Sequence, residues 1–261
     1  MGVKIWDLVL SFYKDGMKEV FLLLFSLAGY LIIYRNLMVQ VRNSGKKILY
    51  LVLAVFTVFC LLIVIRQSKR ITGFVYFYYG LKSQSEEQID LAFKEYCDAY
   101  TLFPDNPRFL EKAAYFSYYF ALFQQAVKLY DELQALGKMT DSDRYLLIEC
   151  LLQCGELQRA GKLLESMPEG QENPEVNFYL GWYFCKLGKM EKSLEYYRKS
   201  AALDQRKSRC YWEMFQIELQ TGTKEALSEL SKILELPDKT DKYYKKARSY
   251  LKSNFPENGD Q

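Results

Sequence analysis

The sequence repeats a pattern at intervals of 33 or 34 residues, and this period constrains the fold more than any other feature. Small residues recur at this spacing at Ala92, Ala126, Ala160, Ser193 and Ala226. Four positions after each stands a large residue: Tyr96, Tyr130, Leu164, Tyr197 and Leu230. Twelve positions before each stand Gly80, Ala114, Ile148, Gly181 and Met214. Such a period indicates similar units that stack to bury their apolar faces together.

Within each unit the apolar residues follow a helical period, and no segment alternates as a strand would. The pairs Asn106-Pro107 and Asn173-Pro174 place a capping residue before a proline at the first helical position. Asp141 is a further candidate cap. Gly155 and Gly188 each precede a small residue by five positions, where a tight or left-handed turn joins two helices. We therefore predict antiparallel helical pairs.

These features resemble the tetratricopeptide-repeat family, whose 34-residue unit is a pair of antiparallel helices. The resemblance is carried by Tyr79-Gly80, Ala92, Tyr96, Ala99 and Pro104 in the first unit, and by Leu180-Gly181, Gly188, Ser193 and Tyr197 in the fourth. The third unit departs from it at Ile148, and the fifth is one residue shorter before Ala226. The resemblance implies a solenoid of about five repeats and a capping helix over residues 71–252, with a disordered tail at 253–261.

Two apolar runs precede the repeats. Residues 48–65 contain no charge and would form a helix of about 27 Å, close to the thickness of a bilayer core. Residues 20–34 are short for a span, so a signal peptide or an interfacial helix are alternatives. We predict an all-α protein with an N-terminal transmembrane hairpin over residues 20–70, with spans at about 20–34 and 48–65. Residues 1–19 would form an amphipathic surface segment or extend the first span.

The charge is unevenly distributed, although the whole chain carries only +3. Residues 1–72 have a net charge of +7, ten basic minus three acidic residues, and the remainder has −4, 25 basic minus 29 acidic. Because the basic part holds the apolar runs, it favours a lipid bilayer contacted through residues 20–65 and not a nucleic acid. Lys and Arg counts around the runs favour a multi-pass protein of the cell membrane with cytoplasmic repeats. Repeats outside the cytoplasmic membrane remain the alternative.

The residue types argue against catalysis. The chain contains no histidine, so it lacks a Ser-His or Cys-His nucleophile pair and a histidine-ligated metal. Cys150 and Cys154 share a helical face, but two thiols without further ligands do not make a metal site. No glycine-rich phosphate-binding loop occurs. We expect a protein that is not an enzyme, with no cofactor, no metal and no small-molecule substrate.

The family resemblance also implies a binding groove lined by the first helix of each repeat. The positions that the family uses there correspond to Tyr115, Tyr118, Tyr119, Tyr145, Glu149, Phe178, Trp182, Tyr211 and Phe215. This aromatic surface with acidic points suits a protein or peptide with apolar and basic residues. The carboxylate clamp of some relatives is absent, because Glu111 and Tyr115 stand at its positions. The alternative is that several of these aromatics pack between helices.

Together these features predict a membrane-anchored adaptor or scaffold that recruits a protein partner or assembles a complex. The alternative is a periplasm-facing assembly or quality-control factor of the cell envelope. A run of basic residues follows the repeats at Lys242, Lys245, Lys246 and Arg248. We interpret this run as the solvated face of the final helix, although contact with lipid or RNA is an alternative.

Overall fold

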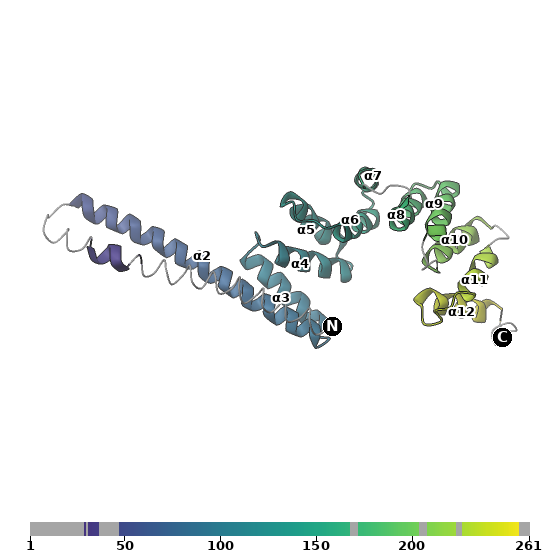
Figure 1. The fold of residues 1–261 in the computed structure, drawn as a ribbon, viewed down its shortest axis with the longest axis horizontal. Coiled ribbons are helices and arrows are strands. Elements are labelled where there is room, and N and C mark those ends of the chain that lie inside the picture. Colours follow the sequence, from purple (N-terminus) through teal and green to yellow (C-terminus); the bar gives the residue numbers. More distant parts are fainter. Residues whose placement is uncertain are drawn as a thin grey trace. The chain divides into compact units, whose positions relative to one another are not determined.

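A computed structural model describes residues 29, 31–36, 47–167, 172–203, 208–222 and 226–255, with side chains omitted at 47–51 and 53 (Figure 1). Every long element of regular structure in these ranges is a helix, and none is a strand. The prediction of an all-helical fold is therefore confirmed.

The chain divides into two compact units, residues 1–138 and 139–261. Unit 1 contains α2 (Lys47–Ser85), α3 (Ile89–Leu102), α4 (Pro107–Tyr119) and α5 (Phe123–Ala135). Unit 2 contains α6 (Asp141–Cys154), α7 (Leu157–Glu165), α8 (Pro174–Lys186), α9 (Met190–Leu203), α10 (Ser208–Thr221), α11 (Ala226–Leu234) and α12 (Lys242–Asn254).

The helices pack as consecutive pairs. In unit 1, α2 packs against α3 and α4 against α5. In unit 2, α6 packs against α7, α8 against α9 and α10 against α11. The final helix α12 contacts both α10 and α11, which is the place expected of a capping helix. The recurring small residues of the sequence pattern lie on the second helix of each pair: Ala92, Ala126, Ala160, Ser193 and Ala226.

Helix α2 is 39 residues long and passes residue 70 without a break, so its C-terminal part is also the first helix of the first repeat. None of the helices among the described residues is both long enough and apolar enough to cross a bilayer. In α2 the apolar stretch is followed directly by the basic residues Arg66, Lys69 and Arg70. The prediction of a two-span membrane protein is therefore wrong.

The other predictions for the termini concern residues that the structure leaves out for the most part. Residues 1–19 and 20–28 lie outside the described ranges, and of the first apolar run only 29 and 31–34 are described, as helix. At the C-terminus, α12 extends to Asn254, and residues 256–261 lie outside the description.

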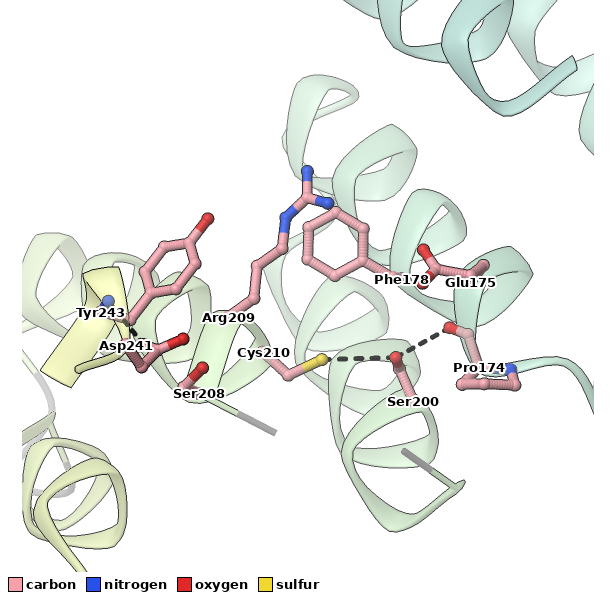
Figure 2. Close-up of a pocket in the computed structure, with 9 residues that line it drawn as sticks. All are labelled: Pro174, Glu175, Phe178, Ser200, Ser208, Arg209, Cys210, Asp241 and Tyr243. Atoms are coloured by element: carbon pink, nitrogen blue, oxygen red, sulfur yellow. Dashed lines mark hydrogen bonds between the residues drawn. The ribbon is translucent and has the colours of Figure 1, made fainter. Parts of the chain in front are cut away.

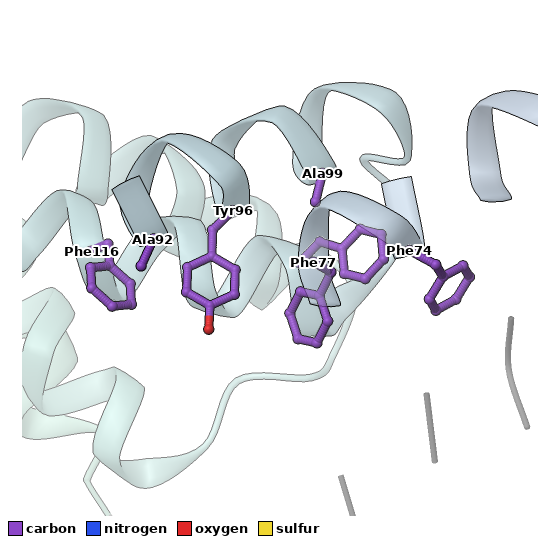
Figure 3. Close-up of a cluster of buried hydrophobic side chains, with 7 residues drawn as sticks. Phe74, Phe77, Ala92, Tyr96, Ala99 and Phe116 are labelled. Carbon is purple, nitrogen blue, oxygen red and sulfur yellow. The ribbon is translucent and has the colours of Figure 1, made fainter. Parts of the chain in front are cut away.

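The core of unit 1 is built from aromatic rings that meet between α2, α3 and α4 (Figure 3). The Phe77 ring stacks on Phe109, with centroids 4.8 Å apart, and also contacts Tyr96 at 5.4 Å. Tyr96 in turn lies 5.2 Å from Phe116. The small side chain of Ala92 is fully buried, as the repeat pattern predicts for a position where two helices approach closely.

A second core closes the C-terminal end of unit 2. The fully buried Phe215 of α10 packs with Leu230 and Ile233 of α11 and with Ala247 of α12. Its ring makes an edge contact with Tyr250 of α12, with centroids 4.9 Å apart. Helix α12 therefore covers the apolar side of the last repeat.

The predicted asparagine caps begin two of the first helices. The Asn106 side chain accepts a hydrogen bond from the backbone N–H of Arg108, and Pro107 is the first residue of α4. Asn173 caps α8 in the same way. Asp141, however, is the first residue of α6 and not its cap. Thr140 takes that role, because its side chain accepts from the N–H of Asp143 while the Asp143 carboxylate accepts from the N–H of Thr140.

The turn inside each repeat uses a left-handed residue. Gly155 and Gly188 have φ angles of 77° and 73°, as their positions predict. Glu87 and Ala121 occupy the equivalent turns of the first two repeats, at φ angles of 61° and 57°. Because a Cβ atom disfavours this conformation, these two turns carry backbone strain that the glycine turns avoid.

Candidate functional site

Aromatic rings from α6 and α8 form a stack in unit 2. The Tyr145 ring of α6 is nearly parallel to that of Tyr179 on α8, with centroids 5.7 Å apart and an interplanar angle of 13°. The Trp182 ring stacks near the same tyrosine, with centroids 6.3 Å apart and an angle of 23°. Tyr179 is buried at 4% exposure, whereas Tyr145 and Trp182 are partly exposed. The two outer rings therefore present apolar surface to solvent over a fixed central ring.

Polar contacts hold this stack in place. The Tyr145 hydroxyl accepts a hydrogen bond from Nδ2 of Asn173, at 3.0 Å. The Tyr179 hydroxyl donates to a carboxylate oxygen of Glu149, at 3.1 Å. An Arg209 guanidinium nitrogen from α10 lies 3.9 Å from the same carboxylate. We call Tyr145, Glu149, Tyr179, Trp182 and Arg209 the aromatic site.

The burial of these groups shifts their ionisation. Burial raises the pKa of Tyr179 well above its usual value, and the nearby Glu149 carboxylate raises it further. The Tyr179 hydroxyl is therefore a neutral donor at physiological pH. Burial also raises the pKa of Glu213, on α10, although Arg209 and Lys246 oppose this shift. The site thus combines a fixed cation with carboxylates in a partly dry environment, where charged contacts are stronger than in water.

A cavity of about 210 Å³ adjoins the aromatic site (Figure 2). On one side the Arg209 guanidinium lies over the Phe178 ring, 3.8 Å from its centroid. The hydroxyl of Ser200 donates to the backbone carbonyl of Pro174 and lies 3.3 Å from the sulfur of Cys210. The remaining lining residues are Glu175, Ser208, Asp241 and Tyr243. The cavity has room for one side chain of a partner.

The predicted site residues of unit 2 differ in how far a partner can reach them. Tyr145, Glu149 and Trp182 belong to the aromatic site. Phe178 is buried at 4% exposure beneath Arg209, so its face is not free. Phe215 is completely buried in the C-terminal core, and Tyr211 packs against that core with Lys232 over its ring. The packing alternative thus describes Phe178 and Phe215 better than a groove position does.

The predicted tyrosines of unit 1 form a separate exposed group on α4. Tyr115 and Tyr119 are 40% and 58% exposed and both contact the buried ring of Phe116. Tyr118 is half-buried against Phe123, with centroids 6.3 Å apart. These side chains are reachable from solvent, but they belong to a different unit from the aromatic site.

The sequence-based prediction missed Tyr179 and Arg209. Counting positions from the start of each repeat selects Phe178, one residue before the ring that actually stacks on Tyr145. The signal that would have found Tyr179 is its spacing of one full repeat, 34 residues, from Tyr145. Arg209 carries no comparable sequence signal, because its role follows from its position over Phe178 and beside Glu149.

The described residues contain no group of three cysteine or acidic side chains that is placed to hold a metal ion. All the cysteines are free thiols, and burial raises the pKa of Cys150 to about 12 and that of Cys97 to about 11. These thiols are therefore protonated at physiological pH, which makes them poor nucleophiles and poor ligands. The aromatic site and its neighbouring cavity offer apolar surface, fixed hydrogen-bonding groups and charge, which are the features of a site that binds a ligand.

No protein-family model matches the sequence, and no curated protein matches it either. Solved structures do match. MamA (residues 41 to the end) from Desulfovibrio magneticus RS-1 is 17% identical, with a TM-score of 0.53 over 63% of this chain and 94% of that one. TTC0263, a thermophilic TPR protein of Thermus thermophilus, is 19% identical, with a TM-score of 0.53 over 69% and 98%.

A third structural match is a Rap protein complexed with Competence and Sporulation Factor. It is 12% identical, with a TM-score of 0.54 over 88% of this chain and 81% of that one. At these identities the matches establish the fold and not the activity. The paired helices, their 33- to 34-residue period and these structural neighbours show that the chain has the fold of a tetratricopeptide-repeat protein.

Proposed function

We propose that this protein is a non-enzymatic scaffold that binds a segment of a protein partner at the aromatic site of unit 2. The helical repeats over residues 71–252 are the part of the chain that performs this role. The partner segment carries apolar residues that cover Tyr145 and Trp182, and a basic residue that approaches Glu149. The protein thereby brings its partner into an assembly by binding and not by chemistry.

The observation that carries the proposal is the stack of Tyr145, Tyr179 and Trp182, whose outer rings are partly exposed while the central ring is buried. Large rings that are held rigidly at a surface lose little conformational entropy when a partner covers them. Asn173 and Glu149 fix the two tyrosines through their hydroxyls before any ligand arrives. Exposed aromatic anchors of this kind are typical hot spots of protein interfaces.

Charge supports the choice of partner. The Glu149 side chain retains 16% of its exposure beside the stack, and Glu175 lines the neighbouring cavity. An arginine or lysine of the partner would form an ion pair with a carboxylate and cation–π contacts with the faces of electron-rich rings. One structural neighbour, a Rap protein, is complexed with Competence and Sporulation Factor, which is a precedent for complex formation by a protein of similar fold.

Selection of peptides from a random displayed library by the full-length protein tests this proposal. Sequences enriched in aromatic or aliphatic residues next to Arg or Lys are expected. A selected peptide should lose affinity for the Glu149→Gln variant and keep it for Glu191→Gln, which removes an exposed carboxylate on α9. Enrichment of acidic peptides that ignore Glu149→Gln, or equal losses in both variants, would contradict the assignment of the site.

A further inference from the structure

The last helix carries a second surface of opposite charge. Five basic residues and no acidic residue lie on α12: Lys242, Lys245, Lys246, Arg248 and Lys252. All five are exposed. At 100° per residue they occupy the half of the helix opposite Ala247, which is the residue that α12 buries in the core. The packing of α12 on α10 and α11 therefore turns the whole basic face outward.

This face is not neutralised within the described part of the chain. No ion pair joins any of the five cations to a described carboxylate, whereas Lys232 and Arg144 each pair with an acid three positions away. Asp241 precedes the helix, but one of its carboxylate oxygens accepts from the backbone N–H groups of Tyr243 and Tyr244. The charge of Lys246 acts to lower the pKa of Glu213, and that of Lys245 acts to lower the pKa of Asp238, but neither lysine forms an ion pair with these acids.

Aromatic rings border the basic face. The Lys246 ammonium lies 5.3 Å from the centroid of the Trp212 ring of α10 and 5.4 Å from that of Tyr243. Lys242 lies 5.8 Å from the centroid of the Tyr243 ring. Both rings are partly exposed. The surface thus offers apolar contact beside concentrated positive charge, which is the composition of a protein-binding surface.

The rest of unit 2 limits what this surface can bind. Residues 139–241 carry 14 basic and 18 acidic residues, a net charge of −4, against +5 on α12. A nucleic acid needs a continuous basic track along its backbone and would run onto the acidic surroundings. A short acidic peptide matches a single helix of 13 residues, which is about 20 Å long.

We propose that the basic face of α12, with Trp212 and Tyr243 at its border, binds an acidic segment of a second protein partner. The surface adjoins the aromatic site, because Tyr243 also lines the cavity beside Arg209, but the aromatic site is expected to prefer basic segments. The scaffold would then hold two partners of opposite charge on one unit.

The test uses the full-length protein and a fluorescein-labelled peptide of about 12 residues with alternating Glu and Leu pairs, long enough to follow the helix. The peptide should bind in low salt, weaken as salt rises, and lose most of its affinity when every Glu is replaced by Gln. The charge reversal Lys245→Glu/Arg248→Glu should weaken binding roughly tenfold or more. The neutral pair Lys245→Gln/Arg248→Gln should weaken it less, and guards against a fold defect in the reversal.

The matched control is Lys162→Glu/Lys189→Glu, which changes the net charge of the same unit equally at two exposed lysines distant in sequence from α12. Measured at physiological salt, its affinity should stay within about twofold of the parent protein, because exposed charges more than a Debye length of about 8 Å from the peptide are largely screened. Equal losses in both double variants would overturn the proposal. So would tighter binding of a single-stranded RNA of similar length that depends on Lys245 and Arg248, because the surface would then be a nucleic-acid site.

Discussion

Gly181 of α8 and Tyr197 of α9 meet so closely that a Cβ atom on the glycine would lie 2.7 Å from Cδ1 of the tyrosine ring. Gly80 and Tyr96 form the same pair in the first repeat, at 2.8 Å. Where the third repeat has Ile148 in place of the glycine, the partner position holds the smaller Leu164. The sequence thus compensates volume between these two positions from repeat to repeat, as close packing requires.

The replacement Gly181→Leu should overpack the fourth repeat and lower the free energy of unfolding by about 1–3 kcal/mol. Adding Tyr197→Leu should recover part of this loss, because it makes the room that the third repeat already has. Urea denaturation of the two single variants and the double variant gives the coupling between the sites. Additive effects, with no recovery in the double variant, would show that the two side chains do not compete for space.

The left-handed turn at Ala121 predicts a stabilising substitution. Ala121→Gly should raise the free energy of unfolding by about 0.5–1 kcal/mol, because glycine adopts a φ of 57° without the steric cost that alanine carries there. The turn's hydrogen bonds, from Ala121 N–H to Tyr118 and from Leu122 N–H to Ser117, involve only the backbone and are kept. The reverse change Gly155→Ala should destabilise by a similar amount. The melting temperatures of both variants test these two expectations. A lower melting temperature for Ala121→Gly would contradict the inference that the backbone is strained at Ala121.

The buried thiol of Cys150 predicts a dependence of stability on alkaline pH. Burial raises its pKa from 9.0 to about 12, with smaller contributions from Glu149 and Cys154. Below pH 9 the thiol is protonated in both the folded and the unfolded chain, so its full contribution to the free energy of unfolding is present there. Between pH 9 and about 12 the unfolded chain loses the proton first, and stability falls by about 1.4 kcal/mol per pH unit.

Comparison with Cys150→Ala isolates this effect, since the buried tyrosines titrate equally in both proteins. The stability difference between parent and variant should be constant from about pH 7 to 8.5 and should shift steadily in favour of the variant from about pH 9 to 10.5. Chemical denaturation at fixed pH values measures it. Parallel curves over the whole range would mean that the thiol is solvated in the folded protein.

Particular residues show what the sequence can and cannot predict. Asn106 and Asn173 were identifiable as caps because a cap followed by proline is a local signal, and Gly155 because left-handed turns favour glycine. Thr140 was missed in favour of Asp141, since capping depends on which residue leaves the helical conformation. Two residues of the aromatic site, Tyr179 and Arg209, were not predicted, because they enter the site only through contacts between α6, α8 and α10.

The membrane prediction failed for a different reason. It rested on the composition of residues 48–65, an uncharged segment whose length in residues matches that of a transmembrane helix. In the structure this run belongs to a helix that continues to Ser85 and carries the first repeat, where Phe74 and Phe77 pack into the core of unit 1. Composition alone does not reveal where a helix ends, and so it did not show that the helix containing this run continues into the first repeat.

Trp182 provides the sharpest test of the aromatic site, because its ring is partly exposed and stacks near Tyr179 without filling the core. If it anchors a partner, Trp182→Ala should weaken binding of a selected peptide by about 2 kcal/mol or more, roughly thirtyfold in affinity. The melting temperature should fall less than for a core tryptophan, whose loss costs about 3–5 kcal/mol.

The matched control for Trp182→Ala is Leu203→Ala, which truncates an exposed apolar residue on α9 and should change neither value appreciably. An unfolded Trp182→Ala protein would make the residue part of the core, and a stable variant that binds normally would move the partner surface elsewhere. Melting temperature and affinity must therefore be measured on the same variant, because only a large loss of affinity with a small loss of stability assigns the ring to binding.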